Sequence, residues 1–309
     1  MNNLVWVFQI ILSAGKCPTQ LSQTPNLYHG RKAALPLNIV IIGCGLGGLA
    51  AAYCLGKAGH RITVLESAST ISEVGAGIQI SPNMTRLLLR WGLGEKLKKT
   101  SVAPEAISFR RCEYNHSVLN QCYLDVCADD SGERIGCTRL GKDMEEQHGA
   151  PYYHVHVRAH YLRLPSLFIH RTQRADLHNM LFHLAWPFMN LRLNSKVVSL
   201  EPSVPFATLE SGEVVTADVI IGADGIKSVA RETVVGGPDK PVPTGDAAYR
   251  AIVPTSEMIK EPDLKELVDF PEMTGWMGPQ KHVVGYLIVR VVKKPITLSF
   301  SPWFSSPHI

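Results

Sequence analysis

A glycine-rich turn beginning at residue 43 has the spacing that binds the phosphates of a dinucleotide. Gly43, Gly45 and Gly48 form the pattern G-x-G-x-x-G, and Glu66 ends the second apolar run that follows. In this pattern the first glycine permits a tight turn and the second lets a pyrophosphate approach the backbone. The third glycine lets the following helix pack closely on a strand, and the acid accepts hydrogen bonds from ribose hydroxyl groups. These residues therefore predict dinucleotide binding.

The elements that must position this turn are two strands and the helix between them. Residues 37–42 form a short β-branched run that is typical of a buried parallel strand. Residues 49–57 are rich in Ala and Leu and predict a helix, with Gly59 where a helix C-terminal glycine belongs. Residues 60–65 predict the second strand. The β-α-β unit would present the N–H groups and partial positive charge of the helix N-terminus to the phosphates.

A second group of candidate residues follows an antiparallel meander. Runs at 191–201, 206–209 and 214–221 are separated by turn residues, which indicates strands joined by tight turns. The last run leads into the segment Gly222-Ala223-Asp224-Gly225-Ile226-Lys227-Ser228-Val229-Ala230-Arg231. Asp224 and Arg231 are candidates for cofactor binding. A structural ion pair between them at a strand–helix junction is the alternative, and both can hold at once.

Two of these segments resemble one family of enzymes. The residues after Glu66 include Glu73-Val74-Gly75-Ala76-Gly77-Ile78 and Pro82-Asn83. This segment resembles the salicylate-hydroxylase-like branch of the flavoprotein hydroxylases, the FAD-dependent aromatic-ring monooxygenases, in which an E-x-G-A-G-I-x-x-x-P-N segment lies beside the flavin. An ordinary glycine loop leading into a core helix is the alternative.

The segment from Asp224 to Arg231 is similar to the D-G-x-x-S-x-x-R motif of the same family. In that family the motif lies near the flavin pyrophosphate and is implicated in the use of NADPH or NADH. The resemblance therefore implies FAD as the cofactor, bound in part by Ala76, Gly77, Asp224, Gly225 and Arg231.

A third similarity to the family is interrupted. The family pattern Y-x-x-H-R-A-D-L-H contains an Arg that contacts the flavin cofactor, and Arg174 is the matching residue. His156 and Arg174 are separated by residues 157–173, and removing these residues restores the pattern. Because Val codons begin with GT and one Gln codon ends with AG, we predict that 157–173 is translated intron sequence. A genuine surface loop is the alternative, and a transcript that keeps these codons would establish it. Residues 112–128 carry a weaker case of the same kind.

The candidate substrate residues lie further along the chain. Residues 245–251 resemble the t-G-D-x-A-Y-R-A-x-V-P stretch that opens the substrate-domain sheet of the family. Arg250 is then a candidate for binding a substrate carboxylate or phenolate, since guanidinium binds such anions through two hydrogen bonds; an exposed structural Arg is the alternative. Residues 282–289 continue this sheet and contain Tyr286, a second candidate catalytic residue. Residues 291–309 carry no resemblance.

The predicted fold class is α/β, with a Rossmann-like FAD-binding domain that includes a three-stranded β-meander and a partial α+β substrate domain with an antiparallel sheet. The predicted divisions are an extension outside the fold at 1–35, the FAD-binding domain at 36–235 with insertions at 112–128 and 157–173, a partial substrate-domain sheet at 236–290, and a non-family tail at 291–309.

The function that the resemblance implies is an FAD-dependent monooxygenase. It would consume NADPH or NADH and O2, and hydroxylate a phenolic or related small aromatic substrate through a flavin hydroperoxide. An inactive truncated remnant of such an enzyme and an NAD-dependent dehydrogenase are the alternatives, and a yellow purified protein would argue against the dehydrogenase.

Charge, cysteine spacing and hydropathy argue against nucleic-acid binding, a metal site and a membrane span. The net charge of +4 without a block of Lys or Arg argues against a nucleic-acid partner. The seven cysteines form no C-x-x-C pair and no metal-binding spacing with His, so we expect no metal and reduced thiols in a cytoplasmic protein. The apolar run at 4–12 is shorter than the roughly 20 residues that span a bilayer. Membrane association or secretion through this N-terminus is the alternative.

Overall fold

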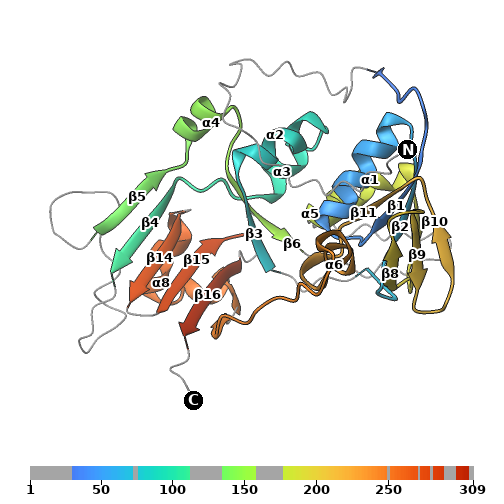
Figure 1. The fold of residues 1–309 in the computed structure, drawn as a ribbon. Helices are drawn as coiled ribbons and strands as arrows, with labels where there is room; N and C mark the ends of the chain where they lie inside the picture. Colours follow the sequence, from blue (N-terminus) through green and yellow to red (C-terminus); the bar gives the residue numbers. More distant parts are fainter. Residues whose placement is uncertain are drawn as a thin grey trace. The chain divides into compact units, whose positions relative to one another are not determined.

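The computed structural model describes residues 30–71, 76–111, 134–157, 177–248, 251–270, 272–278, 281–288 and 297–305. The chain divides into two compact units (Figure 1). The first includes Asn26–Val74 and Arg158–Val242, and the second includes Gly75–Val157 and Pro243–Ile309. The predicted insertion 112–128, most of 157–173 and most of the predicted extension 1–35 lie outside the described residues.

A four-stranded parallel sheet forms the centre of the first unit, in the order β11–β1–β2–β7. Its strands are β1 (Asn38–Ile42), β2 (Arg61–Leu65), β7 (Met189–Arg192) and β11 (Val219–Gly222). All residues of β1 after Asn38 are buried, as expected for a central parallel strand. The predicted β-α-β unit is confirmed, since α1 (Leu46–Ala58) connects β1 to β2 and ends at Gly59 in the left-handed conformation.

The predicted meander is a separate antiparallel sheet in the order β10–β9–β8. Its strands are β8 (Val197–Glu201), β9 (Phe206–Leu209) and β10 (Val214–Thr216). A cluster of buried side chains joins it to the ends of β1 and β2: Val40, Ile42, Leu65, Val197, Ala207, Leu209 and Ala230. The remaining described helices of the unit are α5 (Leu177–Ala185), η2 (Trp186–Phe188), η3 (Gly225–Lys227) and α6 (Val229–Val235).

Two of the predicted strands are wrong in extent. The run 191–201 is divided between β7 and β8, and the run 214–221 is divided between β10 and β11. The first division falls at a turn in which Asn194 has φ 52°, a conformation that Asn tolerates better than most residues. As a result β7 pairs in parallel with β2 instead of joining the meander.

The second unit contains a larger sheet in which β12–β16–β15–β14–β4–β5 are neighbours and β13 also pairs with β16. Its strands are β4 (Ala106–Arg111), β5 (Arg134–Arg139), β12 (Asp246–Ala248), β13 (Ala251–Pro254), β14 (Met273–Gly278), β15 (Lys281–Leu287) and β16 (Thr297–Ser305). The pairing is antiparallel except between β14 and β4. Thus β16, from the predicted tail 291–309, pairs with this sheet.

A two-stranded antiparallel sheet of β3 (Ala76–Ile80) and β6 (Tyr153–Val157) also belongs to the second unit. The helices of this unit are α2 (Pro82–Arg90), α3 (Gly94–Thr100), α4 (Lys142–His148), α7 (Thr255–Met258) and α8 (Pro262–Asp269). The second compact unit therefore contains Gly75–Val157 together with the chain after Pro243. The sequence-based division instead placed Gly75–Val157 within the domain 36–235, and those domain boundaries stay a prediction. Within the described ranges, every helix is too short or too polar to cross a bilayer.

Candidate cofactor site

A cavity of about 550 Å³ lies at the carboxyl ends of the parallel strands in the first unit. In open parallel sheets, ligands bind in the crevice beyond the carboxyl ends of the strands. The residues that line it come from the ends of β1, β2 and β11, the start of β8 and the turn before α6: Ile42, Gly43, Gly45, Leu65, Glu66, Ser67, Ser195, Lys196, Val197, Ala223, Asp224, Gly225, Ile226, Lys227 and Val229.

The glycine turn between β1 and α1 has little room for side chains on its inner side. Gly43 has φ 101°, which favours glycine, and a Cβ atom there would lie 2.3 Å from the carbonyl oxygen of Ala223. A Cβ atom on Gly48 would lie 2.0 Å from the carbonyl oxygen of Gly43. By contrast, no atom lies within 4 Å of a Cβ built on Gly45, which lines the cavity. The turn is therefore closed toward the protein and open toward the cavity.

Glu66 joins the glycine turn to the end of β2. One carboxylate oxygen accepts a hydrogen bond from the backbone N–H of Cys44 (2.9 Å). The other accepts from the backbone N–H of Ala68 (2.9 Å) and from the hydroxyl of Ser67 (3.2 Å). These bonds orient the carboxylate at the cavity wall, where the sequence predicts a contact with ribose.

His178 is a buried residue of the site for which the sequence predicted no role. It lies in α5, its exposed fraction is 1%, and its Nε2 atom lies 2.9 Å from the carbonyl oxygen of Cys44. Because a carbonyl can only accept, Nε2 donates this hydrogen bond. His178 is the final His of the R-A-D-L-H pattern, and this position in the pattern is the only feature of the sequence that points to a role for it. Its partner Cys44 lies 134 positions earlier in the chain.

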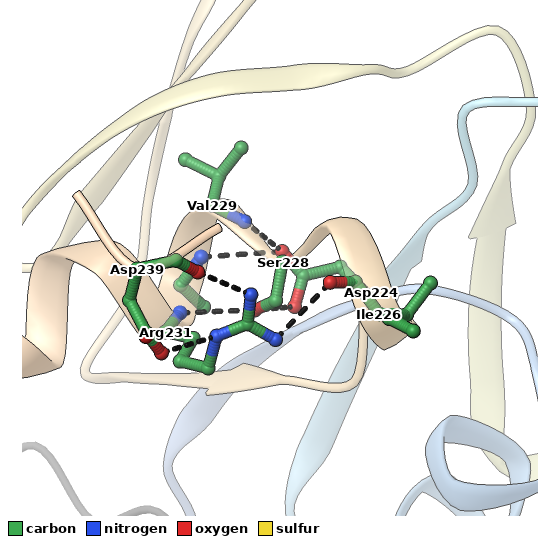
Figure 2. A network of polar contacts seen from close by, with 7 residues as sticks. Asp224, Ile226, Ser228, Val229, Arg231 and Asp239 are labelled. Carbon is green, nitrogen blue, oxygen red and sulfur yellow. Dashed lines mark hydrogen bonds and ion pairs between the residues drawn. The ribbon is translucent and has the colours of Figure 1, made fainter. Parts of the chain in front are cut away.

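The carboxylate of Asp224 binds the first turn of α6, whose N-cap residue is Ser228 (Figure 2). It accepts hydrogen bonds from the hydroxyl of Ser228 (2.6 Å) and from the backbone N–H groups of Val229 (2.8 Å) and Ala230 (3.2 Å). Ser228 in turn accepts from the backbone N–H of Arg231 (2.9 Å). The first N–H groups of a helix have no partner within the helix, so this network satisfies them.

The side chain of Arg231 also contacts this turn. Its guanidinium donates to the carbonyl of Ile226 (3.1 Å) and pairs with the carboxylate of Asp239 (2.7 Å), as Figure 2 shows. The alternative of an ion pair between Asp224 and Arg231 is wrong, because the Asp224 carboxylate is occupied by the donors of the first turn of α6 and Arg231 pairs with Asp239. Both residues therefore hold the turn whose Gly225 lines the cavity.

Residues Ala76, Gly77 and Ile78 of the G-A-G-I segment lie on β3 in the second unit. Ala76 and Gly77 pair with β6. A Cβ atom on Gly77 would lie 2.4 Å from Cγ2 of Ile288 and 2.8 Å from Cε2 of Tyr286, so no side chain fits there. The hydroxyl of Tyr286, a predicted catalytic residue, donates to the carbonyl of Gly77 (3.0 Å). Tyr286 therefore contacts the segment that the resemblance places beside the flavin.

His154 packs against Tyr286 in the same unit, with ring centroids 4.7 Å apart. Its Nδ1 atom lies 3.1 Å from the carbonyl oxygen of Leu287. Burial lowers the pKa of His154 from 6.5 to about 4, and its bond to the Leu287 carbonyl opposes that shift. The ring is therefore neutral at physiological pH. Among the described residues, no group of three or more His, Cys, Asp or Glu side chains is arranged to hold a metal ion.

Two predicted site residues, Arg174 and Arg250, lie outside the residues that the structure describes. The structure thus brings together Gly43, Gly45, Glu66, Asp224 and Gly225 around one cavity. Gly48 supports the turn from inside α1.

Comparison with known proteins places the chain in a family. A family profile described as "FAD binding domain" matches residues 37–295. The chain is 33% identical over 261 residues to FAD-dependent monooxygenase OpS4 of Beauveria bassiana (strain ARSEF 2860), covering 82% of this chain and 52% of that protein. It is 30% identical over 254 residues to 3-hydroxybenzoate 6-hydroxylase of Klebsiella oxytoca, covering 81% of this chain and 53% of that protein. The chain spans about half the length of these curated relatives.

Solved structures show the same fold. The structure of CtdE in complex with FAD and substrate 4 aligns with a TM-score of 0.65 at 20% identity, covering 88% of this chain and 58% of that chain. The structure of 2,6-dihydroxypyridine-3-hydroxylase from Arthrobacter nicotinovorans aligns with a TM-score of 0.63 at 19% identity, covering 90% and 58%. With most of its length matched by the profile, the chain belongs to the FAD-binding domain family.

Proposed function

We propose that this chain belongs to an enzyme that uses FAD, NADPH or NADH, and O2 to hydroxylate a small phenolic or related aromatic compound. The observation that carries the proposal is the cavity at the carboxyl ends of β1, β2 and β11, because its walls combine the glycine turn, Glu66 and the capped turn at Asp224.

The residues present fit the ADP part of FAD. The cavity, about 550 Å³, lies in the size range of roughly 300–1,000 Å³ that small-molecule sites occupy. The open side of Gly45 lets a pyrophosphate approach the backbone, and the N-terminus of α1 offers N–H donors and a partial positive charge. Glu66 would hold the ribose through the carboxylate that the loop already orients. Bound FAD supplies the redox chemistry, taking electrons from NADPH or NADH and activating O2.

The chain's own residues supply position and charge. Asp224 and Arg231 hold the turn at Gly225 against the cavity, and Arg174 is the further residue that we propose to contact the flavin cofactor. Tyr286 supports β3 through the carbonyl of Gly77.

On the substrate side we propose that Arg250 binds a carboxylate or phenolate. Relatives are named for 3-amino-4-hydroxybenzoate and 3-hydroxybenzoate, both of which carry such groups. A hydroxylated benzoate is therefore the substrate class that we propose, with Arg250 as its anion-binding residue and Tyr286 as a residue that acts near the reacting ring.

The experiment measures oxidation of NADPH and NADH by the purified, FAD-loaded chain, with and without 3-hydroxybenzoate or 3-amino-4-hydroxybenzoate. We expect the aromatic compound to stimulate oxidation, O2 to be consumed, and the product to gain one oxygen atom by mass spectrometry. Arg250→Lys keeps the charge but loses the paired geometry, so we expect it to raise KM more than it lowers kcat. Absence of bound flavin, or oxidation that proceeds equally without O2, would refute the proposal.

A further inference from the structure

The two peptides that flank Cys44 are each held by one side chain. Cys44 lies between Gly43 and Gly45, and its N–H donates to the Glu66 carboxylate (2.9 Å). Its carbonyl accepts from Nε2 of His178 (2.9 Å), a side chain that is 1% exposed. Both polar groups of the Cys44 backbone therefore have partners, one at the cavity wall and one in the interior against α5.

The His178 contact determines which way the next N–H group faces. In a planar trans peptide, the carbonyl of Cys44 and the N–H of Gly45 point in opposite directions. His178 holds the Cys44 carbonyl toward the buried side, so the Gly45 N–H is directed away from His178. Gly45 lines the cavity, and no atom lies within 4 Å of a Cβ built on it.

The glycine pattern alone does not determine this orientation. Turning the peptide over changes ψ of Cys44 and φ of Gly45, and glycine adopts positive φ about as readily as negative φ. Both orientations are thus open to the backbone. The donor on α5 selects one of them, because the other would leave the buried imidazole N–H without the Cys44 carbonyl and would turn the Gly45 N–H inward.

We propose that His178 is a positioning residue that aims the Gly45 N–H at the pyrophosphate of the dinucleotide. The inference rests on the proposed binding of FAD in this cavity. It assigns a cofactor-orienting role to a side chain that does not itself line the cavity, acting through one backbone peptide.

Three substitutions separate hydrogen bonding from packing. His178→Gln places an amide N–H near the position of Nε2 and should restore the bond to Cys44. His178→Asn ends near the position of Nδ1 and should not reach, and His178→Leu has no donor. Met180→Leu is the matched control, since Met180 lies in the same helix, is buried, and changes little in volume.

The measurements are FAD affinity by quenching of flavin fluorescence, the 31P NMR shifts of the bound pyrophosphate, and thermal unfolding followed by circular dichroism. We expect the Gln variant and the control to bind FAD like the unsubstituted chain. The Asn and Leu variants should bind roughly tenfold more weakly, the loss expected from one hydrogen bond, with altered 31P shifts.

Each other outcome overturns the inference in a distinguishable way. Unchanged affinity and 31P shifts in the Asn and Leu variants would show that the bond does not orient the turn, while FAD binding by the unsubstituted chain would leave the proposed function standing. Equal losses in the Gln and Asn variants would assign His178 to packing alone. If the Leu variant does not fold, the Gln and Asn pair decides. If the unsubstituted chain binds no FAD, both the inference and the proposed function are refuted.

Discussion

Two neighbouring glycines at the start of α1 differ in what surrounds them. A Cβ atom on Gly48 would lie 2.0 Å from the backbone carbonyl oxygen of Gly43, whereas a Cβ on Gly47 meets nothing within 4 Å. Backbone atoms cannot move aside as a flexible side chain can, so only Gly48 requires the absence of a side chain.

We therefore predict opposite effects for two single substitutions. Gly48→Ala should push α1 from β1, lower thermal stability and weaken FAD binding at least about tenfold, the loss expected when one hydrogen bond to the cofactor is displaced. Gly47→Ala should bind FAD normally and stabilise the helix by roughly 0.5–1 kcal/mol, because Ala has the higher helix propensity. Flavin fluorescence titration and thermal unfolding measure both; equal behaviour of the two variants would contradict the role given to the turn.

Residues differ in how far their contacts can be predicted from the sequence. The conformation of Gly43 and the close approach at Gly48 are local consequences of a strand, turn and helix, so the pattern was sufficient to predict them. The contact of His178 with Cys44 depends on how α5 packs against α1, which a single sequence does not show. For Arg231 the partner is Asp239, eight positions further along the chain, and not Asp224, which the sequence offered as an alternative.

At the scale of elements, α6 depends on one carboxylate. Asp224 accepts two backbone N–H groups and the Ser228 hydroxyl, which together organise the first turn of the helix. The turn before it lines the cavity, so helix and site share this support.

Asp224→Ala leaves the N-cap residue Ser228 in place but removes the acceptor of the Val229 and Ala230 N–H groups. It should lower the free energy of unfolding by about 1–2 kcal/mol, the usual cost of leaving such donors without a partner, and should also weaken FAD binding. Glu95→Gln is the control, because it removes a carboxylate from an exposed pair with Lys98 at 3.9 Å, where little effect is expected. Urea unfolding at pH 7.5 gives the comparison. A midpoint of the Asp224 variant equal to that of the control would show that α6 does not need this carboxylate.

Strand positions were more predictable than strand partners. Apolar runs located β1, β2, β9 and β15, since alternation and β-branched residues are local signals. Nothing local indicates that β7 pairs with β2, or that β4 and β14 pair in parallel. These pairings arise from packing between distant segments. The turn at Asn194 that separates β7 from β8 is a local feature, and it was missed because apolar residues on both sides made the run look continuous.

For the molecule as a whole, the buried neutral ring of His154 couples stability to pH. The pKa of His154 is about 4 in the folded chain, against an ordinary value of 6.5. Between pH 6.5 and pH 4, His154 therefore binds a proton in the unfolded chain but not in the folded chain. The contribution of neutral His154 to the free energy of unfolding should therefore be fully present above about pH 6.5 and should decrease as the pH falls toward 4. Each pKa unit corresponds to about 1.4 kcal/mol, so the loss reaches roughly 3 kcal/mol.

His154→Asn should remove this dependence while keeping an N–H near Nδ1 for the carbonyl of Leu287. Denaturant unfolding at several pH values between 7.5 and 4.5, followed by tryptophan fluorescence, to which the buried Trp91 and Trp276 of the same unit contribute, measures the difference between the two proteins. Carboxylates titrate in both and cancel in that difference. Parallel curves for the variant and the unsubstituted chain would show that His154 does not contribute.

The α/β class, the β-α-β unit and the cofactor family could be predicted from the sequence, because motifs and apolar periodicity carry them. The division of the chain into two compact units could not, since it places Gly75–Val157 with residues after Pro243. Contacts between segments that distant are set by packing and not by local pattern.

The central strand of the parallel sheet has a consequence for synthesis of the protein. β1 pairs with β2 almost at once, but its other partner is β11, and the bonded residues Asn38 and Asp218 are 180 positions apart. At about 5–20 residues per second, the ribosome needs roughly 10–40 s to make the intervening chain. During that time one edge of an apolar strand presents unpaired N–H and C=O groups, which is the kind of surface that initiates aggregation. We therefore expect the nascent chain to be most prone to aggregation in the interval between the synthesis of β1 and that of β11.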